Sequence, residues 1–508
     1  MQNAVDLLLS IVWHDALVYL LLGAGLFYSI LTRFVQVRMF REMLSLLFIN
    51  KSSNKGISSF QALAVSLSGR VGTGNIAGVA AAIGFGGPGA VFWMWVVAFL
   101  GASTAYIEST LGQIYKEDDD GEYRGGPAYY IEKAMGQTWY AWLFAVVTLL
   151  SCGLLLPGVQ SNAIGTAVEV ALGPGQMIAT GFGEIGSTKL ITGTVVVIFL
   201  GVVIFGGVKR IASVTQFVVP FMALAYIITA VIIVSLNINK VPEILGLIVG
   251  DAFTPMAGIG AAIGWGVKRG VYSNEAGQGT GPHAAAASEV EHPAQQGLVQ
   301  AFSVYVDTLL VCTATALMIL ITGAYNVHNP AAEGLFLVQN LDADVVTNGP
   351  AYTQFALDRM LPGFGKPFIA VALFFFAFTT LLAYYYIAET NVAYLRRKLS
   401  LPGALLVLKI ALLAAVFYGT VRTADLAWAL GDLGVGLMAW LNIIALLILF
   451  FMARPALVAL KDYERQRRAG VATYSFDPEG LGIQRADFWV RRWRRQKNDE
   501  NQTDKSTE

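Results

Sequence analysis

The sequence predicts an all-α polytopic membrane protein with about eleven transmembrane helices. Hydrophobic residues make up 56% of the 508 residues and charged residues 13%, about half the share of roughly 25% that is typical of soluble domains. The mean hydropathy of +0.59 leaves too little polar material to cover water-facing domains. Lys and Arg number 34, as do Asp and Glu, so no net charge recruits nucleic acid. The lipid bilayer is therefore the expected surrounding.

Eleven apolar runs are long enough to cross about 30 Å of hydrocarbon. Most are apolar on every face, as expected of helices that are buried or face lipid. The runs are 15–37, 58–83, 87–115, 139–170, 188–207, 210–236, 255–285, 295–323, 367–394, 403–421 and 425–453.

The distribution of Lys and Arg between alternate loops predicts the orientation. If the amino terminus is outside, the inner loops and the tail hold 25 of these residues and the outer loops hold 5. Basic residues accumulate on the cytoplasmic side of membrane proteins. We therefore expect the amino terminus outside and the carboxyl terminus in the cytoplasm.

The chain divides into four parts by this pattern. Residues 1–57 form an extra helix and a cytoplasmic loop, 58–236 and 237–453 each hold five core helices, and 454–508 form a basic cytoplasmic tail. Within the tail, Phe488 to Lys497 mixes aromatic residues with Arg. This composition is typical of a topology-setting positive segment, and a lipid-surface anchor is the alternative.

Two of the core spans contain clusters of glycine and polar residues that a lipid-facing helix would not tolerate. They are Ser66 to Gly78 and Lys268 to Gly279. Glycine costs about 1 kcal/mol per helical position relative to alanine, so each cluster favours local unwinding. Unwound backbone at membrane depth persists only where it faces protein or a water-filled cavity.

The two clusters lie in the first and sixth of the ten core helices, which run in opposite directions. Interrupted helices at corresponding places in two halves are typical of an inverted-repeat secondary transporter. Helix packing alone would explain the glycines but not the charged residues, each of which costs about 2.5–3.5 kcal/mol at mid-bilayer. An uncoupled channel or facilitator is the alternative with the same spans.

Other classes of protein find little support in the sequence. The four histidines are not spaced as metal ligands, and Cys152 and Cys312 both lie in apolar runs. No GxxxxGK[ST] pattern occurs, so a nucleotide is not expected to drive the protein by that route. We therefore expect neither an enzyme nor an organic cofactor.

The segment Gly86 to Gly101 (GGPGAVFWMWVVAFLG) resembles the signature of the alanine or glycine:cation symporters, also called the sodium:alanine symporter family. Gly72 to Asn75 and Ser273 to Gly277 resemble that family's two broken-helix motifs. The likeness covers about residues 10 to 455. It implies a LeuT-like five-plus-five inverted repeat in the cell membrane of a bacterium or archaeon, with no obligatory protein partner.

The resemblance also implies a coupling ion and a substrate class. The ion is Na⁺, with H⁺ as the alternative, and the substrate is a small neutral amino acid such as alanine or glycine. Serine and glutamine remain open as substrates.

A zwitterionic amino acid needs donors for its carboxylate and acceptors for its ammonium. N–H groups freed at the first break suit the carboxylate, carbonyls freed around Tyr272 to Ala276 suit the ammonium, and two aromatic side chains could cover a methyl-sized group. The predicted substrate-binding residues are Gly72, Thr73, Gly74, Asn75, Tyr272, Asn274, Gln278 and Phe376.

The LeuT-like fold implies a sodium site between the first break and the eighth core helix. The carbonyls of Ser68 and Val71 and the hydroxyls of Thr379 and Thr380 are the predicted ligands, and the side-chain oxygen of Asn75 could serve a second ion. Threonine hydroxyls within a helix often bond only to the preceding turn, which is the alternative for the pair.

Charged residues within the spans need partners in a low dielectric. The cations are Arg70, Lys268 and Arg269, and the carboxylates are Glu108, Glu275 and Asp307. These residues either form ion pairs that gate one side of the protein or form a static buried network. Asp307 or Glu275 could instead carry a proton.

Overall fold

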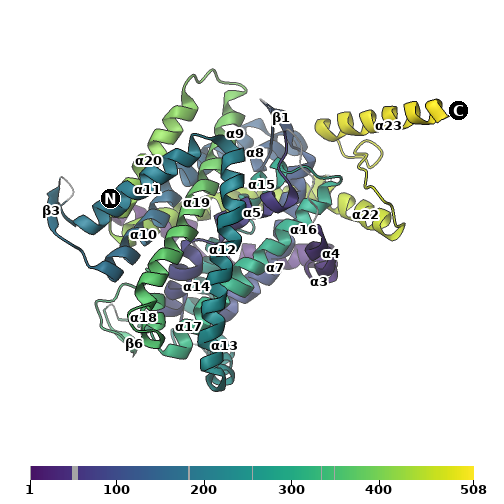
Figure 1. Ribbon diagram of the computed structural model, residues 1–508. Coiled ribbons are helices and arrows are strands. Elements are labelled where there is room, and N and C mark those ends of the chain that lie inside the picture. Colours follow the sequence, from purple (N-terminus) through teal and green to yellow (C-terminus); the bar gives the residue numbers. More distant parts are fainter. Residues whose placement is uncertain are drawn as a thin grey trace.

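The computed structural model of the protein is almost entirely helical (Figure 1). It describes residues 2–47, 55–119, 121–180, 183–254, 256–332, 334–347, 349–452 and 454–507. Within these residues, nine helices are long and apolar enough to cross a membrane, and two further apolar spans are interrupted. Together they account for the eleven predicted spans and confirm the polytopic all-α class.

The amino-terminal span differs from the predicted 15–37. Helices α1 (Gln2–Val12) and α2 (Asp15–Leu31) meet at His14, whose imidazole accepts a backbone N–H at the start of α2. Arg33 and Phe34 have positive φ angles of 54° and 53°, so the helix ends before them. The short helices that follow are α3 (Val35–Arg38) and α4 (Phe40–Leu46).

The first five core helices begin at a capping box, in which Ser58 and Gln61 each accept a hydrogen bond from the other's backbone N–H. The helical elements are α5 (Ser59–Arg70), the π-helical turn η1 (Gly74–Gly78), α6 (Val79–Gly86), α7 (Ala90–Ile114), α8 (Pro127–Tyr130), η2 (Ile131–Met135), α9 (Thr138–Leu150), η3 (Ser151–Leu155), α10 (Leu156–Leu172), α11 (Ser187–Ile204) and α12 (Gly207–Leu236).

The second set of core helices follows η4 (Ile238–Lys240) and α13 (Val241–Phe253). Its helical elements are α14 (Ile259–Asn274), α15 (Gly281–Ala287), α16 (Pro293–Val304), η5 (Tyr305–Cys312), α17 (Thr313–Thr322), α18 (Ala351–Met360), α19 (Gly365–Arg396), α20 (Ala404–Val421) and α21 (Ala424–Met452). The tail adds α22 (Pro455–Arg468) and α23 (Asp487–Thr507).

Among the described residues, the loops contain three two-stranded antiparallel hairpins. They are β1 (Glu117–Asp119) with β2 (Glu122–Arg124), β3 (Met177–Thr180) with β4 (Gly183–Gly186), and β5 (Asn326–His328) with β6 (Phe336–Gln339). The tail helices α22 and α23 lie on the side of the body opposite to β3 and β6 (Figure 1). This placement agrees with loops that alternate between the two sides of a membrane.

The interrupted helices lie at the centre of the packing. α7 packs against α14, α15 and α16, while α10 packs against α19, α20 and α21. The interrupted α5 contacts α12 and α19, and the turn η1 contacts α14. The two breaks are therefore brought together and surrounded by continuous helices.

Candidate substrate and sodium site

The first break lies between α5 and η1, at Val71 and Gly72. The N–H of Gly72 donates to Oδ1 of Asn75 at 2.8 Å, and the N–H of Thr73 donates to Oε1 of Gln160 on α10 at 3.0 Å. A Cβ at Gly72 would overlap the hydroxyl of Thr380, so only glycine allows this approach to α19. The predicted anion-binding N–H groups thus point at neutral amide oxygens.

The second break spans 275–280, between α14 and α15. Glu275 has a φ of 56°, and Gly277 and Gly279 have φ values of 86° and 83°, which glycine tolerates. Because α14 continues through Asn274, the carbonyls of 272–274 lie at its carboxyl end, where the last turn leaves acceptors without helical donors. The Val271 carbonyl is used internally, since it accepts the N–H of Glu275 and Nε2 of Gln278.

The open backbone of the second break is held by Glu108 of α7. Its carboxylate accepts the N–H of Gly277 at 3.3 Å, the N–H of Gly279 at 3.2 Å and Nδ2 of Asn442 at 2.8 Å. Asn442 of α21 also donates to the Gly277 carbonyl at 3.0 Å. Glu108 therefore holds the unwound backbone of the second break in place. The sequence had suggested instead that Glu108 pairs with a buried cation.

A cluster around Asp307 of η5 joins the two breaks. Its carboxylate accepts Nδ2 of Asn75 at 2.7 Å, the Ser273 hydroxyl at 2.9 and 3.1 Å, and the Thr308 hydroxyl at 2.6 Å. Asn75 belongs to the first break and Ser273 to the last turn of α14. All of these donors are neutral, and Asp307 is fully buried. A buried carboxylate with only neutral donors favours a cation nearby.

The two interrupted helices also touch directly beside this cluster. A Cβ at Gly74 would lie 3.1 Å from Cα of Ser273 and 3.2 Å from the Tyr272 ring. The sequence assigned the space at Gly74 to the substrate, whereas the structure fills it with α14.

On the eighth core helix, only one of the two threonines faces the first break. The Thr380 hydroxyl donates to the Ser68 carbonyl at 2.7 Å. The Thr379 hydroxyl bonds to carbonyls of the preceding turn and lies 3.8 Å from the sulfur of Met222 on α12. Thr380 and Ser68 are thus adjacent, while Thr379 points toward another helix.

The two predicted aromatic walls occupy different surroundings. The Tyr272 ring packs against Trp428 of α21 with a centroid separation of 4.9 Å. The Phe376 ring packs against Tyr226 of α12 at 5.3 Å. Tyr272 therefore lies beside the helix contact at Gly74, and Phe376 lies one helical turn from Thr380.

An ion cluster lies on α14 within two helical turns of the second break. Asp432 of α21 accepts Arg269 at 2.8 and 3.2 Å, and Nζ of Lys268 lies 2.7 Å from the same carboxylate. The Arg269 guanidinium also lies 4.2 Å from the centroid of Trp428. Arg70 instead donates to the carbonyl of Gln300 at 2.9 Å. Two of the three buried cations thus share one carboxylate.

Several of these residues were not singled out from the sequence. Asp432 was detectable as an acid in the interior of the apolar run 425–453, and Gln160 as an amide inside 139–170. Ser273 lies inside the second broken-helix motif and Asn442 is an amide inside 425–453, but the sequence does not show which residues they contact. Trp428 carries no signal, because a tryptophan is ordinary in a membrane helix.

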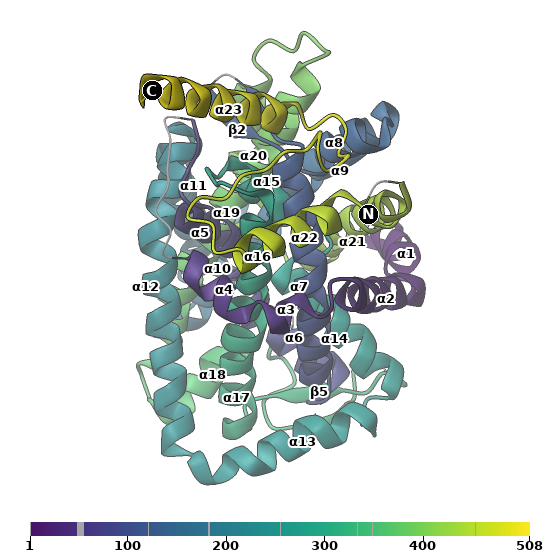
Figure 2. The same ribbon diagram turned by 90° about the vertical axis from the view of Figure 1, so that its right-hand side faces the viewer.

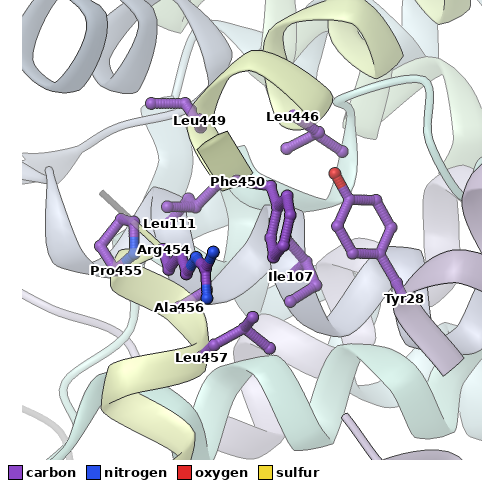
Figure 3. A pocket seen from close by; sticks show the side chains of 10 residues that line it. All are labelled: Tyr28, Ile107, Leu111, Leu446, Leu449, Phe450, Arg454, Pro455, Ala456 and Leu457. Atoms are coloured by element: carbon purple, nitrogen blue, oxygen red, sulfur yellow. The ribbon is translucent and has the colours of Figure 1, made fainter. Parts of the chain in front are cut away.

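A small cavity elsewhere in the molecule is not a candidate for the site (Figure 3). Its lining comes from α2, α7, α21 and the start of α22, and consists of Tyr28, Ile107, Leu111, Leu446, Leu449, Phe450, Arg454, Pro455, Ala456 and Leu457. These side chains are almost all apolar and lie away from both breaks. The described residues contain no group of His, Cys, Asp or Glu suited to a transition metal either.

Comparison with known proteins decides the family. A model of the sodium:alanine symporter family matches residues 1–477. The chain belongs to the sodium:alanine symporter family. Members of this family are membrane transporters, so the protein is a transporter and not an enzyme.

Individual relatives in the sodium:alanine symporter family match nearly the whole chain. The "Putative sodium/proton-dependent alanine carrier protein YrbD" of Bacillus subtilis (strain 168) is 56% identical over 497 residues, covering 97% of this chain and 98% of its own. The "Sodium/proton-dependent alanine carrier protein" of Bacillus sp. (strain PS3) is 51% identical over 462 residues, covering 90% and 99%.

A solved structure supports the fold independently. The crystal structure of MhsT in complex with L-phenylalanine matches with a TM-score of 0.53 at 14% identity, covering 79% of this chain and 100% of that chain. At this identity the likeness concerns the fold alone, and it confirms the LeuT-like architecture.

Proposed function

We propose that this member of the family is a symporter that couples inward sodium movement to the uptake of alanine, and also of glycine, by alternating access. The observation that carries the proposal is the Asp307 cluster, in which one buried carboxylate bonds to residues of both broken helices. An ion held there would couple the positions of the two helices. The names of the relatives support alanine and sodium as the transported pair.

The substrate carboxylate would bind at the first break. The N–H groups of Gly72 and Thr73 now donate to the amide oxygens of Asn75 and Gln160, which stand in for the carboxylate oxygens. A charged acceptor makes stronger hydrogen bonds than an amide, so the substrate would displace them. Gly74 would contribute by lacking a side chain, which allows η1 and α14 to pack closely.

The substrate ammonium would bind at the carboxyl end of α14, where the helix dipole is negative. The Asn274 side-chain oxygen, which accepts the N–H of Ala276 at 2.9 Å, and the amide of Gln278 would help to orient it. Tyr272 would cover the methyl group from the side of Trp428. Phe376, packed on Tyr226, would limit the pocket from the side of α12.

The oxygen atoms near the two breaks could form two sodium-binding positions. The carbonyls of Ser68 and Val71 with the Thr380 hydroxyl form the first, where unwound carbonyls favour a cation. Thr379 would have to rotate away from Met222 to join it.

The second sodium position would use Asp307, Ser273 and the side-chain oxygen of Asn75. Because Asn75 now directs its Nδ2 to Asp307, its amide would turn to present oxygen to the ion.

We also propose the membrane arrangement that the sequence predicts. The protein would lie in the cell membrane of a bacterium or archaeon with its amino terminus outside and its tail in the cytoplasm. The repeats 58–236 and 237–453 would rock around the two breaks, as in other inverted-repeat transporters.

The experiment that tests the function is uptake of radiolabelled alanine by the purified protein in liposomes. An inward sodium gradient is expected to drive accumulation of alanine, and an inward proton gradient without sodium is not. Unlabelled glycine should compete with alanine, with serine and glutamine as the comparison. Uptake that only equilibrates alanine, with or without sodium, would contradict symport and favour a facilitator.

A further inference from the structure

The carboxyl-terminal tail lies across the end of the helix bundle instead of leaving it. We use "strap" for residues 455–495, which comprise α22, the segment 469–486 and the first turns of α23. The strap begins with α22, doubles back over the body, and ends in α23, as Figure 2 shows. Trp489 and Phe476 of the strap are each only 1% exposed. Such burial is typical of a docked segment.

The strap closes an aromatic box around a lysine at the end of α7. Nζ of Lys116 lies 4.4 Å from the ring centroid of Tyr123, 4.6 Å from Phe488 and 5.4 Å from Trp489. The same ammonium donates to the Ser288 carbonyl at 2.8 Å. Two of the three rings belong to the strap, so Lys116 is covered only while the strap is docked.

The indole of Trp489 fixes the strap to the same helix. Its Nε1 donates to the carbonyl of Gln113 at 2.8 Å. Arg492, one turn further on, pairs with Glu289 at 2.5 Å. α7 and the loop before α16 are thus joined by consecutive turns of α23.

A second part of the strap holds the loop between α15 and α16. Asp462 of α22 lies 3.4 Å from Nε2 of His292, and the backbone N–H of Tyr474 donates to Glu291 at 3.0 Å. The ring of Phe476 lies 5.0 Å from the His292 ring, edge to face. This loop follows α15, the helix that continues from the second break, so its position is joined to that of α15.

A third set of contacts joins the strap to η2, the turn before α9. Lys133 of η2, which precedes α9, lies 3.7 Å from Asp487, and its carbonyl accepts Nη1 of Arg485 at 3.3 Å. The strap therefore ties the ends of α7 and α15, which carry or contact the second break, to an element of the neighbouring α9.

Docking of the strap buries a charged group, and this free-energy cost favours release of the strap as well as docking. Burial lowers the pKa of the Lys116 amine well below its usual range, and the Glu289 carboxylate opposes this only in part. Arg454, directly before the strap, adopts a φ of 48° and is one of the residues that line the cavity of Figure 3. A strained residue beside free volume is suited to act as a hinge.

We propose that the strap is an autoinhibitory brake on transport. Docked, it holds the ends of α7 and α15 against η2 and keeps this side of the protein closed. Released, it lets these ends part so that the substrate can leave. The proposal rests on the proposed function for its probe, alanine uptake, while docking itself is measured separately.

The first test compares Trp489→Ala with Trp493→Ala in the full-length protein. Trp493 lies one turn further along α23 and contacts Lys497 of the same helix, so it is a matched control. Losing the indole hydrogen bond and the cation–π contact is expected to speed hydrogen exchange at 113–116 and 287–292 roughly tenfold. The maximal rate of alanine uptake should rise severalfold with an unchanged KM, and the control should match the wild type.

The second test fixes the strap in place. Lys133→Cys with Asp487→Cys, joined by a short reducible thiol cross-linker, is expected to stop uptake, and reduction should restore it. Each variant with only one of the two introduced cysteines, treated with the same reagent, is the control, and the native Cys152 and Cys312 are both buried. This test keeps its value if Trp489→Ala does not fold.

The outcomes separate the two proposals. Full uptake by the cross-linked protein would overturn the brake, as would faster exchange in Trp489→Ala without a faster maximal rate. Absence of alanine uptake in the wild type would refute the proposed function. The exchange measurement would then still report whether the strap is docked.

Discussion

Replacing Asp307 by Asn tests whether its carboxylate holds an ion or only fastens three helices. The substitution keeps the shape of the side chain but removes the charge, and one oxygen becomes a donor that faces the donors of Asn75 or Ser273. A unit charge near a bound cation contributes about 4 kcal/mol at 4 Å with an effective dielectric constant near 20. After desolvation, we expect about 2.7 kcal/mol, or roughly a hundredfold weaker sodium binding.

The loss of folding stability should be much smaller. The hydroxyls of Ser273 and Thr308 can rotate to the remaining oxygen, so we expect a cost of about 1 kcal/mol. The control is Asp251→Asn, since Asp251 of α13 is another buried carboxylate with neutral donors, the backbone N–H groups of Gly89 and Met256, and it contacts neither break. It should lose stability without a change in sodium requirement.

The assay follows both quantities in purified protein. Thermal unfolding is recorded over a series of sodium concentrations, because a ligand that binds the native state raises stability with its concentration. Sodium dependence of alanine uptake is measured on the same variants. If Asp307→Asn melts at a lower temperature but keeps the wild-type sodium dependence, Asp307 is a structural residue and the second sodium position is wrong.

Three further experiments, with five substitutions in all, test the first sodium position, the first break and the ion cluster. Thr380→Ala should raise the sodium concentration for half-maximal uptake roughly tenfold, while Thr379→Ala changes it little, and equal effects would contradict the first sodium position. Gly72→Ala should abolish alanine binding in calorimetry while the protein remains monodisperse, because the methyl group displaces the Thr380 hydroxyl; undiminished binding would remove this break from the site. Asp432→Asn should lower the free energy of unfolding by about 3–5 kcal/mol, because it leaves Lys268 and Arg269 without their carboxylate. Adding Lys268→Met to Asp432→Asn should restore part of this stability. If the losses of the two single variants instead add up in the double variant, Lys268 and Asp432 do not share a charge interaction.

Much of the fold could be predicted because it depends on composition and periodicity. Apolar length places the spans, and a glycine-rich polar cluster inside a span predicts a break, since both follow from the absence of water in the bilayer core. The first span was predicted to end at 37, but α2 ends at Leu31. The positive φ values of Arg33 and Phe34 end the helix, and hydropathy does not reveal them.

The pairing of residues between helices could not be predicted in the same way. The sequence shows that Arg269 needs a carboxylate, but the nearest candidates along the chain were Glu275 and Asp307, and the partner is Asp432 on α21. Helix packing decides such partners, and no local pattern reports it. For the same reason the sequence treated Thr379 and Thr380 as a pair, although their rotation on α19 separates them.

The central claim is that alanine and sodium are transported together. Sodium entry driven by an alanine gradient measures this coupling most directly. Liposomes containing the purified protein are given an inward alanine gradient with equal sodium on both sides, and entry of radioactive sodium is recorded. Because a symporter carries both ligands in the same cycle, the alanine gradient should drive sodium inward, and Asp307→Asn should strongly reduce that movement at the same sodium concentration. Alanine entry with no accompanying sodium entry would contradict the account.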